Sequence, residues 1–157
     1  MTIPAAAGPP KVLLIVEDQL LIAMSLKDEL EDFGYRVLEL ATRHQEALTT
    51  ARQIRPDLAL VNIDLAADDD GAALAWDLKA IDVPVLFISG QRDRIELACE
   101  AAIASLPKPY TPAEMREAVD YLFRHETGRP ELAAPPKLSV YRPMPAGGGA
   151  RPLAPAA

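Results

Sequence analysis

The chain has 157 residues and half of them are hydrophobic, so it can bury one core and is too short for two large domains. Its formal charge of −7, from 23 acidic and 16 basic residues, leaves no basic surface of the kind that direct nucleic-acid binding requires. The single cysteine, Cys99, excludes an intrachain disulfide and a thiolate metal cluster. Residues 1–10 have neither the basic nor the apolar region of a secretion signal, and the apolar run at 12–16 is too short to span a membrane. We therefore expect a cytoplasmic protein that contacts neither membranes nor nucleic acid directly.

Runs rich in Val, Ile and Leu alternate with segments of helical periodicity between residues 11 and 126. The expected strands lie at 11–16, 35–40, within 56–65, 83–88 and 104–106. The expected helices lie at about 19–33, 42–54, 74–81, 93–103 and 112–125. This alternation predicts an α/β fold of the flavodoxin-like type, a doubly wound (βα)5 arrangement in which helices cover both faces of a five-stranded parallel sheet.

Two of these helices have recognisable capping patterns at their starts. Thr42 and Gln45 have the spacing of a capping box before the second helix. Thr111, Pro112 and Glu114 supply an N-cap, a first-turn proline and an acid at the third position of the last helix.

The chain divides by composition into a tail at 1–10, a domain at 11–126 and a second tail at 127–157. The second tail is rich in Pro, Ala and Gly, a composition that buries little surface. Within it, residues 137–142 have the character of a strand. Two interpretations of this tail stay open: an arm that pairs with a sheet edge or with a second protomer, and a plain linker.

Polar residues stand where four of the expected strands end. Glu17 and Asp18 follow the first strand, Asn62 ends the third, Ser89 follows the fourth and Lys108 follows the fifth. In an open parallel α/β sheet, ligands bind beyond the carboxyl ends of the strands. We therefore expect these side chains to meet in one site.

With the dipeptide Lys108-Pro109 after the fifth strand, this set resembles the receiver domain of bacterial two-component response regulators, over about residues 11–125. The resemblance implies phosphoryl transfer to a strand-end aspartate, with carboxylates holding Mg²⁺ and with the Ser89 hydroxyl and the Lys108 ammonium binding phosphoryl oxygens. In that family's pattern the acceptor aspartate falls where this chain has Asn62. The chain thus resembles a stand-alone receiver whose acceptor carboxylate is an amide.

The resemblance places a metal site at Glu17, Asp18, Asn62 and Asp64, with weaker Mg²⁺ affinity than a site that has a carboxylate at position 62. The oxygen of an amide is neutral and its nitrogen is delocalised, so Asn62 is not a plausible phosphoryl acceptor. Asp64 lies on the same side of an extended strand, about 7 Å further along, and is the alternative acceptor. A solvated loop acid is the other interpretation of Asp64.

Two further positions bear on signalling. Ser105 stands in the fifth strand where many receivers have an aromatic switch residue, so we do not expect the Ser89 hydroxyl to be coupled to an aromatic side chain there. Tyr110 follows the Lys-Pro dipeptide, where the resemblance implies an aromatic residue beside a partner-binding surface.

Three functions compete. The leading hypothesis, which is not enzymatic, is an interaction module of a two-component phosphorelay that binds a histidine kinase, a phosphotransfer protein, another regulator or a second copy of itself without ordinary phosphorylation. The second is an active receiver that phosphorylates itself on Asp64 with Mg²⁺ held by Glu17 and Asp18. The third is a flavodoxin-like binder of a nucleotide or flavin, which ranks last because the chain has no Gly-rich phosphate loop after the first strand.

Overall fold

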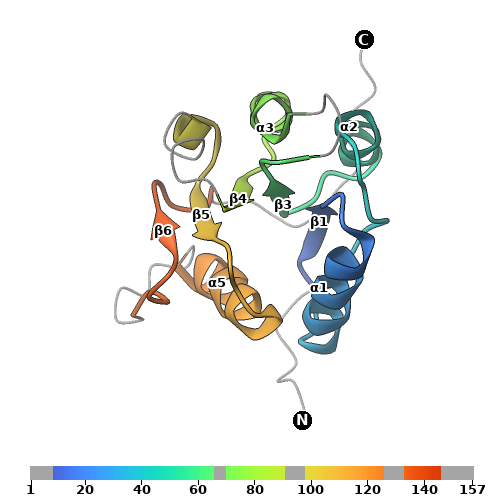
Figure 1. Cartoon of the computed structure of the whole chain (residues 1–157). Helices are drawn as coiled ribbons and strands as arrows, with labels where there is room; N and C mark the ends of the chain where they lie inside the picture. The colour runs from blue at the N-terminus through green and yellow to red at the C-terminus, as the bar shows by residue number, and fades with distance from the viewer. Residues whose placement is uncertain (1–8, 66–69, 91–97, 126–132, 146–157) are drawn as a thin grey trace.

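The structure is a computed structural model that describes residues 9–65, 70–90, 98–125 and 133–145 (Figure 1). Strands alternate with helical segments along most of the chain. In order, the elements are β1 (Val12–Val16), α1 (Leu20–Asp32), β2 (Arg36–Val37), α2 (His44–Gln53), β3 (Leu58–Asn62), α3 (Gly71–Ala80), β4 (Val85–Ser89), the 3-10 turn η1 (Cys99–Ala101), β5 (Ala104–Pro107), α5 (Pro112–His125) and β6 (Ser139–Val140). No helix among the described residues has both the length and the apolar character needed to cross a bilayer.

A six-stranded sheet in the order β2-β1-β3-β4-β5-β6 forms the centre of the fold. β1 to β5 run parallel, and β6 is antiparallel to β5. Parallel neighbours need crossover connections, which helices supply here. The predicted flavodoxin-like arrangement is confirmed. The five parallel strands are those predicted, and residues 139–140 of the second tail add a sixth, antiparallel strand at the β5 edge, which agrees with the interpretation of the tail as an arm that pairs with a sheet edge.

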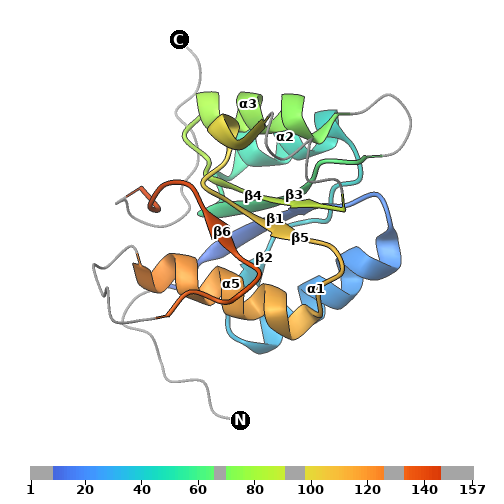
Figure 2. The same ribbon diagram turned by 60° about the vertical axis from the view of Figure 1, so that its left-hand side comes forward.

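Helices cover both faces of the sheet, with α1 and α5 on one face and α2 and α3 on the other (Figure 2). Every residue of β1, β3 and β4 is buried, as expected for strands that read as continuous apolar runs. Successive side chains point to opposite faces, so Leu13 joins the cluster beneath α1 and α5 whereas Leu14 joins the one beneath α2 and α3. The sheet is therefore a rigid platform for whatever lies at its carboxyl edge.

The stretch between α1 and α2 differs from its prediction. β2 has two residues in place of six, and the chain returns to the sheet only as an isolated bridge between Ala41 and Val16. The capping box predicted at Thr42 and Gln45 is wrong. The N-cap of α2 is Arg43, so Thr42 precedes it, and its hydroxyl donates to the Glu46 side chain at 3.0 Å.

The predicted helix at 93–103 is also corrected in its described part. Its first residues, 93–97, lie outside the described residues. Residues 99–101 form only a 3-10 turn, and Ala102 is extended, with φ −119° and ψ 161°. The helix ends there because Ile103 already donates its N–H to the Val85 oxygen and so begins the pairing of β5 with β4.

The predicted start of the last helix is confirmed. The Thr111 hydroxyl accepts from the Glu114 N–H at 3.0 Å, and the Glu114 carboxylate accepts from the Thr111 N–H at 3.0 Å. This reciprocal pair satisfies two N–H groups at the helix end that otherwise lack partners. It fixes the start of α5 at Pro112, four residues beyond Lys108.

Candidate functional site

The carboxyl ends of four strands bring polar side chains to one edge of the sheet. β1 is followed by Glu17 and Asp18, β4 ends at Ser89 and β5 is followed by Lys108. β3 lies between β1 and β4, so Asn62 at its end is central. Hydrogen bonds and one ion pair join these residues into a group that we call the strand-end site: Glu17, Asp18, Asn62, Asp64, Ser89 and Lys108.

The side-chain amide of Asn62 is buried at the centre of this site. Its Nδ2 donates to Glu17 Oε1 at 3.2 Å, to Asp18 Oδ1 at 3.3 Å and to the backbone oxygen of Asp64 at 3.3 Å. Its Oδ1 accepts from the Asp64 N–H at 3.0 Å. A flipped amide would aim an oxygen at two carboxylates and an NH2 group at an N–H, so these partners determine the orientation. The amide thus links the end of β1 to the loop after β3.

Asp64 also belongs to the strand-end site. The buried Ser89 hydroxyl donates to Asp64 Oδ2 at 2.9 Å. Asp64 itself is half-buried and is therefore not simply a solvated loop acid. Asp64 thus connects two sets of hydrogen bonds: its backbone contacts the Asn62 amide, which reaches Glu17 after β1, and its side chain accepts from Ser89 of β4.

Lys108 closes the site from β5. Its Nζ lies 3.9 Å from Glu17 Oε2, which is ion-pair range and beyond hydrogen-bond range. Its backbone N–H donates to the Ser89 oxygen at 3.0 Å, which continues the β4–β5 pairing into the loop. The Lys108–Pro109 peptide bond is cis.

Glu17 is fully buried and incompletely hydrogen-bonded. Its Oε1 accepts from the Gln19 N–H at 3.2 Å as well as from Asn62. Its Oε2 accepts no hydrogen bond within the described structure. Burial raises the pKa of the Glu17 carboxyl above its ordinary value, and the Gln19 N–H and the Lys108 charge offset this only in part. The ionised form of Glu17 therefore lowers the free energy of unfolding relative to its neutral form.

Tyr110 lies beside the site. Its hydroxyl is buried without a hydrogen-bond partner among the described residues. Burial, followed by the nearby Glu17 charge, raises the pKa of Tyr110 to about 12. Tyr110 is thus a neutral phenol at physiological pH, and it packs against the core beneath α1 and α5.

Comparisons with known proteins agree with this fold and site. The profile of the response regulator receiver domain matches residues 13–120. The transcriptional regulatory protein PdtaR of Mycobacterium tuberculosis is 33% identical over 122 residues, which cover 76% of this chain and 60% of PdtaR. The phyllosphere-induced regulator PhyR of Methylorubrum extorquens is 34% identical over 128 residues, which cover 79% of this chain and 48% of PhyR.

A solved structure gives the same result. The CheY-like response regulator receiver domain protein of Methanospirillum hungatei superposes with a TM-score of 0.69 at 27% identity, covering 76% of this chain and 98% of that protein. The fold and the strand-end site define a receiver domain. The chain belongs to the response regulator receiver domain family, and it spans between about half and three fifths of the length of the two curated relatives.

Receiver domains generally bind Mg²⁺ at their acidic pocket, which corresponds here to Glu17, Asp18, Asn62 and Asp64. The oxygens of Glu17, Asp18 and Asp64 that converge in the pocket all accept hydrogen bonds from Asn62 Nδ2. In the described parts of the chain, no group of three or more His, Cys, Asp or Glu residues could hold a metal ion. An amide NH2 group lies where these oxygens converge, which weakens the fit of the four residues to Mg²⁺.

Gly71, at the start of α3, packs closely against the backbone of Asn62 and Ile63. A Cβ at this position would lie 2.3 Å from the backbone oxygen of Asn62 and 2.6 Å from the Cα of Ile63. The Gly71 N–H also donates to the Ile63 oxygen at 3.1 Å. The sequence shows residues 70–71 only as an Asp-Gly turn; it does not reveal that the helix start packs on the backbone that carries Asn62.

We expect Gly71→Ala to lower the free energy of unfolding by about 1–3 kcal/mol, because the added methyl group meets backbone rather than a movable side chain. Urea denaturation measures this change. Gly90→Ala is the matched control, since a Cβ there meets nothing closer than the Lys108 Cβ at 4.0 Å. Equal stability of the two variants would contradict the packing described.

Proposed function

We propose that this receiver domain is an interaction module of a two-component pathway that signals without being phosphorylated, at position 62 or at Asp64. The observation that carries the proposal is the buried Asn62 amide, which donates to Glu17, Asp18 and Asp64 together. The amide has no anionic oxygen to attack phosphorus. Its NH2 group also lies between one oxygen each of Glu17, Asp18 and Asp64, which would otherwise repel one another.

The consequence for signalling is a fixed conformation. Receivers shift between two states when a phosphoryl group and its charge are added. Here that charge cannot be added at Asn62, and Ser89 already donates to the Asp64 carboxylate. The signal that the protein transmits therefore depends on its concentration and on which partner it binds.

Receiver domains of response regulators interact with histidine kinases and phosphotransfer proteins. For this chain we propose a partner of one of these two kinds or another regulator, with a second copy of the chain as a further candidate. Nucleic acid and membranes are not expected partners, given the net charge of −7. The cytoplasm is the compartment in which such partners are expected.

One observation favours a second candidate function, self-phosphorylation on Asp64. The Asp64 carboxylate lies in the strand-end site and accepts from Ser89 at 2.9 Å. A nucleophile beside a hydroxyl that could bind the phosphoryl group has part of the required arrangement. Against it, the oxygens that would neutralise the transferring group through Mg²⁺ are bonded to Asn62.

Incubation with a small-molecule phosphodonor and Mg²⁺, followed by intact mass measurement and site mapping, separates the two functions. We expect no added phosphoryl group on the native protein and labelling at position 62 in Asn62→Asp. Asp64→Asn is the control variant. Labelling of the native protein that is lost in Asp64→Asn would contradict the leading proposal and establish Asp64 as the acceptor.

A further inference from the structure

The β5 edge of the sheet is covered by residues 133–145 of the second tail. Residues 133–145, here called the strap, run along the outer edge of β5 and the flank of α5 (Figures 1 and 2). β6 within the strap pairs antiparallel with β5, Ser139 opposite Ser105 and Val140 opposite Ala104. Just beyond, the N–H groups of Tyr141 and Arg142 both donate to the Ile103 oxygen, at 2.7 Å and 3.2 Å.

Two apolar side chains hold the strap on the core. Leu138 and Met144, six residues apart, are 8% and 7% exposed and belong to the cluster beneath α1 and α5. Between them the strap faces solvent, since Val140 and Tyr141 remain 38% and 37% exposed. The strap is thus attached by a two-residue ladder and two buried anchors.

The polar contacts of the strap are those of a basic peptide on an electronegative surface. Arg142 Nη1 donates to the backbone oxygens of Glu100 at 2.6 Å and Ala102 at 2.9 Å. Lys137 Nζ forms an ion pair with Glu114 at 2.9 Å and donates to the Pro109 oxygen at 3.2 Å. Residues 133–145 contain two basic and no acidic residues. The surface therefore favours a positively charged side chain at two positions of the strap, those of Lys137 and Arg142.

A hydroxyl pair fixes the middle of the strap. The Tyr141 hydroxyl and the Ser105 hydroxyl are 2.6 Å apart, with either one able to donate. Ser105 is buried in β5 and is one of four buried polar residues among those described. The tail thus brings an aromatic side chain to the position in β5 that has none of its own.

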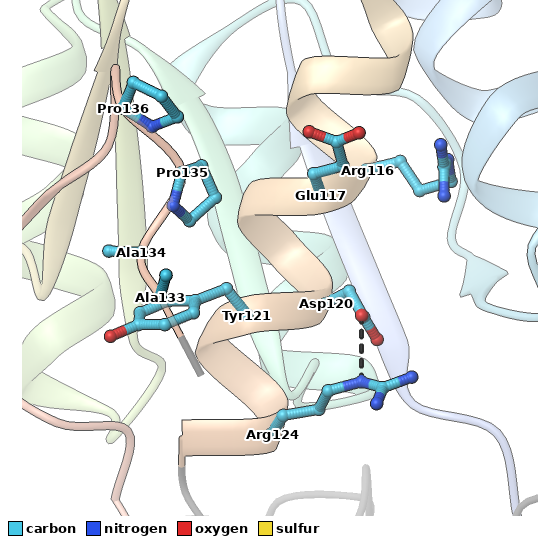
Figure 3. Close-up of a pocket in the computed structure, with 9 residues that line it drawn as sticks. All are labelled: Arg116, Glu117, Asp120, Tyr121, Arg124, Ala133, Ala134, Pro135 and Pro136. Atoms are coloured by element: carbon cyan, nitrogen blue, oxygen red, sulfur yellow. Dashed lines mark ion pairs between the residues drawn. The ribbon is translucent and has the colours of Figure 1, made fainter. Parts of the chain in front are cut away.

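The first residues of the strap do not pack tightly on the helix beside them. A groove of about 350 Å³ separates α5 from the strap, with Glu117 and Tyr121 on the helix side and Pro135 and Pro136 on the strap side (Figure 3). Exposed ion pairs such as the one between Lys137 and Glu114 contribute little to stability. A covering segment with a two-residue ladder and two apolar anchors is one that a peptide with the same contacts can displace.

We propose that the β5 edge and the flank of α5 form a peptide-docking surface that the chain's own strap occupies in the resting protein. Its alternative ligand is an extended basic peptide that adds a strand to β5, places two apolar side chains six residues apart and carries a hydroxyl over Ser105. Unpaired strand edges recruit such peptides through backbone hydrogen bonds. Because Lys137 contacts the Pro109 oxygen, displacement of the strap also frees the loop that carries Lys108.

The test uses the full-length chain and a fluorescent synthetic peptide with the sequence of residues 133–145. Leu138→Asp removes one anchor and should release the strap, so we expect this variant to bind the peptide at least about tenfold more tightly than the native protein. Val140→Asp is the matched control: the same kind of change at an exposed strap residue should leave peptide binding at the native level.

Hydrogen exchange provides the second measurement. In Leu138→Asp the Tyr141 and Arg142 amides should exchange faster, whereas the amides of β1 and β3 should stay protected, which shows that the domain is folded. If Leu138→Asp does not fold, the double variant Tyr141→Phe/Arg142→Ala releases the strap without touching the core. Failure of the peptide to bind a folded, released variant, or equal binding to the native protein, would overturn the proposal.

Discussion

Replacing Asn62 by aspartate is expected to lower the free energy of unfolding by about 2–4 kcal/mol in the absence of divalent cations. The change removes the side-chain donor that Glu17, Asp18 and the Asp64 backbone oxygen share, and it places a third carboxylate about 3 Å from the first two. In a domain of this size the thermal midpoint should fall by about 5–10 °C.

Mg²⁺ should reverse much of this loss in Asn62→Asp and have little effect on the native protein. A cation that binds only the folded state stabilises it in proportion to the logarithm of its concentration. The aspartate variant offers converging carboxylates, whereas the native amide already uses the same oxygens. Thermal unfolding with millimolar Mg²⁺ or with a chelator measures both effects.

Gln45→Glu is the matched control for this experiment. It makes the same amide-to-carboxylate change on the exposed surface of α2 and should leave both the thermal midpoint and its Mg²⁺ dependence close to native. The interpretation of Asn62 fails if Asn62→Asp is as stable as the native protein without cations, or if Mg²⁺ stabilises both proteins equally.

Glu17→Gln is expected to raise the free energy of unfolding at neutral pH, by about 1 kcal/mol. The substitution keeps an oxygen to accept from Gln19 and Asn62 but removes a buried charge whose Oε2 accepts no hydrogen bond within the described structure. Lys108 loses an ion-pair partner at 3.9 Å, which costs less because its side chain is partly exposed.

The pH dependence of this gain has a definite sign. Because burial raises the Glu17 pKa above its ordinary value of 4.5, the folded state binds a proton more readily than the unfolded state does. The associated stability is present below pH 4.5 and is lost as the pH rises through the raised pKa. Glu17→Gln avoids that loss, so its advantage should appear across this interval and vanish in acid.

Urea denaturation of native protein and Glu17→Gln at a series of pH values gives this difference directly. Glu39→Gln, at an exposed position, is the control for the general effect of removing one negative charge. A Glu17→Gln variant that is less stable than the native protein at neutral pH would show that the Glu17 charge is satisfied rather than strained.

Much of the site could be predicted from the sequence because its residues stand where apolar strands end. The runs at β1, β3 and β4 are continuous and fully buried, so their polar successors had to meet at one edge of a parallel sheet. The capping pair of Thr111 and Glu114 could also be predicted from the sequence, since both residues lie within one turn of helix.

Other features depended on distant contacts that local patterns do not contain. The partners of the Asn62 amide lie up to 45 residues away in the chain, and the Ser89 hydroxyl could have pointed elsewhere than at Asp64. The helix expected to reach Ile103 stops early because its backbone pairs with Val85 of β4. β6 has only two residues, and its place on the β5 edge depends on buried Leu138 and Met144 rather than on strand propensity.

The most direct measurement of the central claim is the NMR spectrum of the Asn62 side chain. Asn62 is the only asparagine in the chain, so [15N]asparagine labelling gives a single side-chain NH2 group. If the amide closes the strand-end site, its two protons should exchange slowly with solvent and their shifts should not move when millimolar Mg²⁺ is added. Fast exchange, or a shift that follows the Mg²⁺ concentration, would contradict a site closed by its own amide.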